Sequence, residues 1–275
     1  MMQVTTTWQV PVTLDQKGNM GYLIRMGNQQ TRILIGTSGW TYDHWKGLFY
    51  PADLPKSRWF DYYATKFPSV EINATFYRTF KDQTYHKWRD RAPAGFTYVL
   101  KAPKLITHRK YLEGVEGEIR GFWRSASLLE NKLGLILLQV APGTPYDLER
   151  LKSAILSFCD PRKVAVEFRN KKWLTDEVRN LLIDLGAVFC NPDSPRDKLT
   201  DWATSDVAYI RLHGREHWYS HNYSVAELQE IKELASRMGE NGAKTVYILF
   251  NNDFEGYAPK NAMALMEMLK TDPTS

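Results

Sequence analysis

Short apolar runs rich in β-branched and aromatic residues recur along most of the chain and predict buried strands. They cover residues 32–40, 69–76, 96–104, 134–142, 163–170, 186–192, 207–214 and 245–253. Between them lie segments with apolar residues three and four positions apart, which predict amphipathic helices. These segments cover 58–67, 84–91, 119–134, 146–158, 175–186, 224–239 and 261–270. Eight strands that alternate with helices predict a parallel sheet closed into a single TIM-type (β/α) eight-stranded barrel.

Capping residues support these helix boundaries. Asp147, Thr175 and Ser224 stand where helices begin, and their side-chain oxygens can accept hydrogen bonds from free backbone N–H groups. Three glycines are predicted to end helices: Gly134, Gly186 and Gly239. The weakest segment is 194–206, which allows only a short helix.

The barrel is assigned to residues 32–275, a length typical of one such domain. Residues 1–31 fall outside the repeat and form an N-terminal extension. Within it, residues 12–26 are typical of two strands joined by a turn with glycine and asparagine, so a β-hairpin-like extension is expected. A disordered extension is the alternative.

Composition indicates an ordinary globular protein, with 43% hydrophobic and 24% charged residues. No segment is apolar enough for a signal peptide or a membrane span, so we expect a cytoplasmic protein without a membrane partner. Cys159 and Cys190 lack metal-ligand spacing, and both are predicted to lie in the core. The net charge of +5 is scattered along the chain, which weakly favours anionic partners and does not indicate a dedicated nucleic-acid binder.

Polar residues appear where the predicted strands end, and strand alternation places them on one face. Glu71 shares a face with Asn73, Glu167 with Arg169, and Arg211 with His213, while their apolar neighbours suit packing beneath helices. The polar faces are therefore expected to look into the barrel at its carboxyl end, where active sites of this fold lie. The same strand ends carry Lys101, Gln139, Asn251 and Asn252.

The charges of this set favour an anion over a metal. Glu71 and Glu167 face three cations, Lys101, Arg169 and Arg211, whereas a divalent metal prefers carboxylates and neutral imidazoles without cations beside them. The arginines could hold a phosphate or carboxylate. The alternative is an ion-pair network that only fills the top of the barrel.

Several chemistries stay open for these residues. His213 or either carboxylate could act as general acid or base, and a desolvated Lys101 could form an imine with a carbonyl substrate. Gln139 and Asn251 could instead bond loop backbone.

Aromatic residues are frequent in the loops after the first, second and seventh predicted strands. They could stack on a nucleobase or a sugar, or anchor the loops to the barrel. They are Trp40, Tyr42, Trp45, Phe49, Tyr50, Phe76, Tyr77, Trp218, Tyr219 and Tyr223.

Separate motifs resemble the YecE-like family, a domain of unknown function with a TIM-barrel fold. They include IGTSGWTYDHWKGLFYP, YYATKFPSVEINATFYR, FTYVLKAPKLITH, LILLQVAP, VAVEFRN, YIRLHG, and LFNND followed by APKNAMAL, and they span about 33–269. The resemblance implies strand-end site residues at Gly36, Ser38, Trp40, Glu71, Asn73, Tyr77, Lys101, His108, Gln139, Glu167, Arg169, Arg211, His213 and Asn251. The sixth strand departs from the family pattern, which leaves open whether Asn191 or Asp193 takes the place of its usual aspartate.

We expect an enzyme that acts on an anionic small molecule of phosphorylated or nucleotide-like character. Hydrolase and lyase are the candidate reaction classes, and no cofactor or metal is expected. The expected catalytic residues are Glu71, Lys101, Glu167 and His213. The expected substrate-binding residues are Trp40, Asn73, Tyr77, His108, Gln139, Arg169, Arg211 and Asn251. The alternatives are a non-catalytic protein that binds nucleic acid or another anion, and a metal-dependent barrel similar to isomerases or endonucleases. The sequence predicts no oligomeric state.

Overall fold

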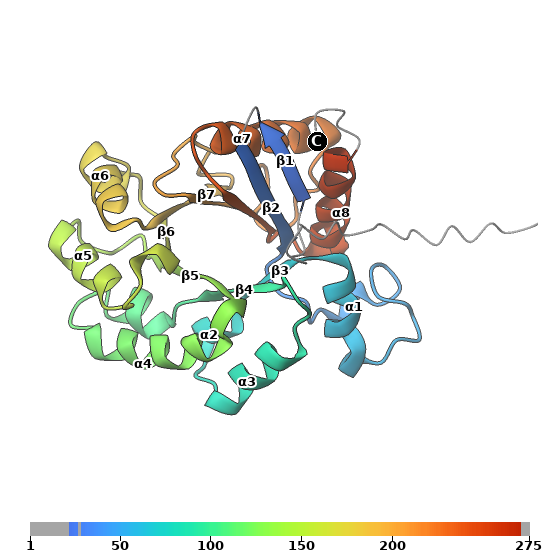
Figure 1. Ribbon diagram of the computed structural model, residues 1–275, viewed down its shortest axis with the longest axis horizontal. Helices are drawn as coiled ribbons and strands as arrows, with labels where there is room; N and C mark the ends of the chain where they lie inside the picture. Colours follow the sequence, from blue (N-terminus) through green and yellow to red (C-terminus); the bar gives the residue numbers. More distant parts are fainter. Residues whose placement is uncertain (1–21, 27–28, 271–275) are drawn as a thin grey trace, which may run out of the picture.

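The computed structural model describes residues 22–26 and 29–270, and its sheet is a closed barrel, as predicted (Figure 1). Eight parallel strands follow one another in chain order, and the first also pairs with the last, which closes the barrel. They are β2 (Gln29–Thr37), β3 (Ser69–Ile72), β4 (Thr97–Lys101), β5 (Leu133–Val140), β6 (Val164–Phe168), β7 (Val188–Asp193), β8 (Val207–Leu212) and β9 (Thr245–Phe250).

Helices surround the strands, so that each strand is buried on both faces (Figure 1). They are α1 (Trp59–Lys66), α2 (Ala74–Tyr77), α3 (Asp82–Arg91), α4 (Glu116–Ala126), α5 (Leu148–Leu156), α6 (Asp176–Leu185), α7 (Val225–Glu240) and α8 (Tyr257–Lys270). Short 3₁₀-helical segments lie at Asp43–Trp45, Lys56–Arg58, Ser127–Lys132, Pro161–Lys163, Lys171–Trp173 and Phe254–Gly256, and a π-helical segment lies at Leu105–Arg109. All seven predicted helical segments contain a helix.

The predicted N-terminal caps are confirmed. Asp147 accepts a hydrogen bond from the backbone N–H of Arg150, and Thr175 accepts one from that of Val178. Ser224 forms a capping box with Glu227, in which each side chain bonds the backbone of the other. These bonds satisfy N–H groups that a helix start leaves free.

One of the three predicted helix-ending glycines is confirmed and two are wrong. Gly186 caps α6 in the left-handed conformation, with φ 65°. Gly134 lies inside β5, where an added Cβ would stand 2.5 Å from the Tyr247 hydroxyl oxygen, and Gly239 lies inside α7, where it would stand 2.6 Å from Thr31 Oγ1. Close packing, and not backbone conformation, requires glycine at both positions.

Strand alternation divides the core into two parts. Val70, Ile72, Val166, Phe168, Ile210 and Leu212 belong to the layer between strands and helices, as predicted. The barrel interior holds a separate cluster composed of Leu34, Val99, Leu135, Leu137, Ala165, Val188, Cys190, Tyr209, Tyr247 and Leu249. Each strand therefore turns every second side chain into the barrel. The same alternation decides which polar side chains at the strand ends face the barrel interior.

Two segments lie outside the regular repeat. Tyr22–Met26 forms β1, which runs antiparallel to the start of β2 and contacts α7 and α8 (Figure 1). The first half of the predicted hairpin lies outside the described residues. The segment 194–206, for which a short helix was allowed, contains none, so the connection from β7 to β8 is a loop.

The two cysteines differ in their surroundings. Cys190 is buried in the barrel, as predicted, but Cys159 is exposed at the turn after α5, so its predicted core position is wrong. In the described part of the chain, no helix combines the length and the apolar character needed to span a membrane.

Candidate functional site

The strand-end residues that alternation turns towards the barrel interior lie together at the carboxyl end of the barrel. The inward side chains include Glu71 on β3, Lys101 on β4, Gln139 on β5 and Glu167 on β6. Arg211 is another, on β8, and Arg169, His213 and Asn251 continue the inward rows just beyond β6, β8 and β9. Hydrogen bonds and ion pairs join most of these side chains, together with Cys190 and Tyr209, into one network. We call it the strand-end network and define it as Glu71, Gln139, Glu167, Arg169, Cys190, Tyr209, Arg211, His213 and Asn251.

Arg211 is the centre of the strand-end network and is buried with both carboxylates. Its Nη2 and Nε donate to the two oxygens of Glu71, at 2.6 and 2.8 Å, and its Nη1 donates to Glu167 Oε2 at 3.1 Å. Tyr209 adds a short hydrogen bond to Glu71 Oε2. Burial would raise the pKa of Glu71, but the charge of Arg211 and these hydrogen bonds outweigh it and keep that pKa below its usual value. Glu71 is therefore ionised and fully engaged.

Glu167 has a second set of donors. Arg169 Nε lies 2.5 Å from its Oε1, and Gln139 Nε2 donates to the same oxygen at 2.8 Å. Burial opposes ionisation, yet the charges of Arg169 and Arg211 hold the pKa of Glu167 well below its usual value. Among the described residues, no group of three or more His, Cys, Asp and Glu side chains is arranged to hold a metal ion.

His213 is a neutral hydrogen-bond acceptor in this setting. Its Nε2 lies 2.9 Å from Arg211 Nη1 and 3.0 Å from Arg169 Nη2, and both groups can only donate. Burial, followed by the charge of Arg211, lowers the pKa of His213 to about 3. On the other side of the ring, His213 Nδ1 lies 3.0 Å from Asn251 Nδ2.

Lys101 lies beside the strand-end network and has no counterion in contact with it. Its Nζ stands 4.3 Å from the centre of the Phe76 ring, and no hydrogen bond or ion pair joins it to another residue in 22–26 or 29–270. Burial, followed by the charge of Arg211, lowers the pKa of Lys101 to about 8. Because its side chain is only partly buried, a ligand can reach it.

The other predicted binding residues form the rim. His108 packs edge-on against Phe76, and burial followed by the charge of Lys101 lowers its pKa to about 4. Trp40 is partly buried against Phe60, with 5.4 Å between ring centres. Asn73 is partly buried before α2, and Tyr77 in α2 is 76% exposed. The rim side chains are thus more accessible than the carboxylates below them.

Three further inward residues lie at this end of the barrel, and strand alternation alone was not used to predict them as site residues. Tyr209 lies two positions before Arg211 and bonds Glu71, while Cys190 Sγ lies 3.8 Å from Glu167 Oε2. Ser38, given earlier only through the family resemblance, continues the inward row of β2 and is buried, and its Oγ has no hydrogen-bond partner among the described residues. Extending the same alternation one step along each strand would have found all three.

Asn191 and Asp193, the two candidates left open on the sixth predicted strand, both alternate with the inward Cys190 and point outwards. Asn191 bonds Thr200 and the backbone of Trp202, and Asp193 Oδ2 accepts a hydrogen bond from Arg215. Neither side chain joins the strand-end network.

Most loop aromatics serve as anchors. Trp45, Phe49, Tyr50, Phe76 and Tyr223 are buried, and several stack on one another or on α1. Tyr219 is 48% exposed, and Trp218 lies over Arg169, with 5.1 Å from the guanidinium carbon to the ring centre. The Arg169 guanidinium is therefore held from one side by Trp218 and from another by Glu167.

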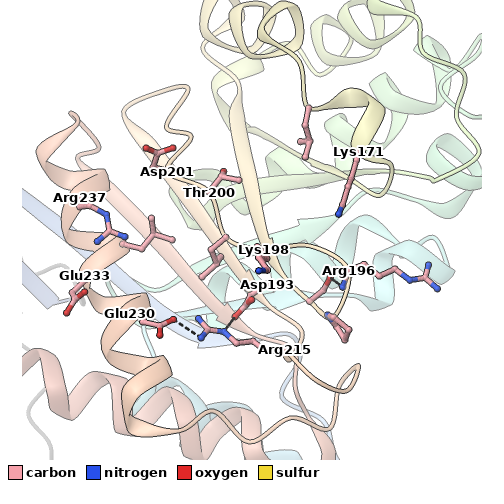
Figure 2. A pocket seen from close by; sticks show the side chains of 15 residues that line it. Lys171, Asp193, Arg196, Lys198, Thr200, Asp201, Arg215, Glu230, Glu233 and Arg237 are labelled. Atoms are coloured by element: carbon pink, nitrogen blue, oxygen red, sulfur yellow. Dashed lines mark hydrogen bonds and ion pairs between the residues drawn. The ribbon is translucent and has the colours of Figure 1, made fainter.

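A groove of about 1070 Å³ lies elsewhere, where the loop 194–206 replaces a helix (Figure 2). One wall is α7, and Arg215 crosses the groove from Asp193 to Glu230 with bonds of 2.9 and 2.7 Å. None of the predicted catalytic or substrate-binding residues lines it. Its acidic and basic side chains are mixed, so it lacks the single-sign field that would favour an ionic ligand.

Comparison with known proteins places this geometry in a family. Residues 34–275 match the sequence model described as "Protein of unknown function DUF72". The chain belongs to the DUF72 family. The narrower YecE-like resemblance remains an expectation.

Relatives of this DUF72 protein align over most of its length, and solved structures of two of them share its fold. The UPF0759 protein YunF of Bacillus subtilis is 26% identical, in an alignment that covers 86% of this chain and 94% of YunF. A crystal structure of a DUF72 family protein from Thermotoga maritima matches with a TM-score of 0.79 and 29% identity, over 86% of this chain and 99% of that one. A DUF72 family protein from Enterococcus faecalis, 20% identical, matches with a TM-score of 0.75 over 87% of this chain and 96% of that one, and shows the fold alone.

Proposed function

We propose that this protein is an enzyme that binds a small anionic substrate at the carboxyl end of its barrel, with Lys101 and Arg169 as the cations that meet the ligand. The observation that carries the proposal is the Lys101 ammonium group, which is partly buried and has no counterion among the described residues. A lysine held in this way costs folding free energy unless a ligand uses it.

The charges of the site support an anion. Glu71 and Glu167 are offset by Arg211 and Arg169, and His213 is neutral, so the positive charge of Lys101 is left over. An incoming phosphate or carboxylate would supply the missing charge.

The accessible cations differ from those expected from the sequence. Four hydrogen bonds engage Arg211 with buried groups, so we assign it to positioning Glu71 and Glu167 and not to substrate binding. Arg169 keeps Nη1 outside these bonds and has a side chain that is 14% exposed. The unpartnered Ser38 hydroxyl offers a neutral donor at the same end.

Titration calorimetry with inorganic phosphate tests this proposal. Wild-type protein should bind phosphate near pH 7, and Lys101→Met should weaken binding roughly tenfold or more, because a charge-assisted hydrogen bond contributes about 1.5–3 kcal/mol. Lys104→Met removes an exposed lysine three positions away and serves as the matched control.

The two variants separate a built site from general charge attraction. Equal weakening in Lys101→Met and Lys104→Met would contradict the proposal, as would phosphate binding that neither substitution changes. Affinity should also fall as the pH rises through about 8, where Lys101 loses its proton.

A further inference from the structure

We propose that Lys101 is a covalent catalytic residue that forms an imine with the carbonyl carbon of the substrate, whose anionic group is held by Arg169. The proposal rests on the anion site described above and adds the substrate class, a carbonyl compound that carries a carboxylate or a phosphate. Imine formation needs a reachable lysine amine that no acidic group holds as a paired ammonium.

The position of Lys101 meets the geometric requirement. It is the last residue of β4, at the barrel end where the βα-loops of this fold carry out chemistry. Its inward direction brings it under the influence of Arg211, Glu167, Glu71 and Arg169, whose charges all affect its titration. Its Nζ lies 4.3 Å from the centre of the Phe76 ring, a cation–π contact that favours the ammonium form less than a carboxylate in contact would.

The two accessible cations have different roles in this proposal: Arg169 binds the anionic group and Lys101 reacts with the carbonyl carbon. A guanidinium group is a permanent cation in proteins, so the one on Arg169 can bind the anionic group while the Lys101 amine is neutral. Trp218 and Glu167 fix the guanidinium in place. A lowered pKa of about 8 leaves about a quarter of Lys101 amines neutral at pH 7.5, against about one in a thousand for an ordinary lysine.

The covalent step is balanced without any further reagent. The amine nitrogen forms a bond to the carbonyl carbon, and the carbonyl oxygen leaves as water with the two amine hydrogens. Protonation of the imine nitrogen then gives an iminium group, which withdraws electrons from the neighbouring carbon. His108 contacts the same Phe76 ring as Lys101, its lowered pKa of about 4 keeps it neutral, and its Nε2 makes no hydrogen bond within the described part of the chain, so this nitrogen is available for proton transfer.

Reductive trapping tests the proposal. Wild-type protein is incubated at pH 7.5 with pyruvate and cyanoborohydride, and with dihydroxyacetone phosphate in a second arm, before peptide mass mapping. We expect the mass of one reduced probe on the peptide that contains Lys101 in at least one arm. Acetone, which lacks the anionic group, should label Lys101 at least about tenfold more slowly.

Variants distinguish this step from the anion site. Lys101→Arg keeps the positive charge, so it should retain phosphate binding but lose the adduct, while Lys104→Met should change neither. Wild-type protein that binds phosphate yet shows no adduct on Lys101 in either arm would overturn imine formation and leave the anion site standing. Equal labelling of the wild-type protein by acetone and by pyruvate would overturn the role given to Arg169. A wild-type protein that neither binds phosphate nor forms the adduct would overturn both proposals.

Discussion

Replacing Lys101 with methionine should stabilise the folded protein. Methionine has similar length but no charge, so it removes the cost of keeping an ammonium group partly buried without a counterion. The pKa of Lys101 falls from 10.5 to about 8, which corresponds to about 3 kcal/mol at about 1.36 kcal/mol per pH unit. The free energy of unfolding at pH 7 should therefore rise in Lys101→Met, by up to about this amount.

The pH dependence of this difference has a defined sign. Between about pH 8 and 10.5, the unfolded chain still binds a proton at Lys101 that the folded protein has released, so wild-type stability rises with pH in this window. Lys101→Met has no such gain. The stability difference between the two proteins should be full below pH 8 and close towards pH 10.5.

Urea denaturation followed by tryptophan fluorescence at pH 7 and at pH 10 measures this difference, with Lys104→Met as the control that should not change it. A Lys101→Met protein less stable than wild type at pH 7 would refute the reasoning, because it would show that Lys101 makes a favourable contact when folded. A difference independent of pH would refute it as well.

Other substitutions test the remaining contacts by the same unfolding assay. Arg211→Met should cost about 3–5 kcal/mol because it leaves Glu71 buried without its cation, and a loss under about 1 kcal/mol would contradict the network. Ser224→Ala should cost about 1 kcal/mol by removing the α7 capping box, and an unchanged stability would count against that cap. Gly134→Ala should cost about 1–3 kcal/mol because its Cβ would meet the Tyr247 hydroxyl, and adding Tyr247→Phe should recover part of that loss.

The pattern of apolar runs was sufficient to predict the barrel, because strands buried on both faces leave a strong signal in the sequence. Alternation within each run also predicted correctly which residues point inwards. The glycines at 134 and 239 were misassigned because their role depends on Tyr247 and Thr31, which lie far away in sequence. Cys159 was misplaced for a related reason, since burial of one residue at a turn is set by tertiary packing and not by local pattern.

The inward direction of the strand-end side chains was predictable from the sequence, but their pairing was not. Arg169 and Arg211 have the same chemistry, yet only the structure shows that Arg211 is buried between two carboxylates while Arg169 reaches the surface. Lys101 and His213 were both candidates for catalysis. Their separation came from contacts, because His213 Nε2 faces two guanidinium groups and Lys101 faces a ring.

A crystal structure grown in phosphate would test the central claim most directly. Our account predicts phosphate at the carboxyl end of the barrel, within hydrogen-bond distance of Lys101 Nζ and the Arg169 guanidinium. Phosphate bound instead in the groove between α7 and the loop 194–206, or Lys101 paired with Glu71 or Glu167 and no anion beside it, would contradict the account.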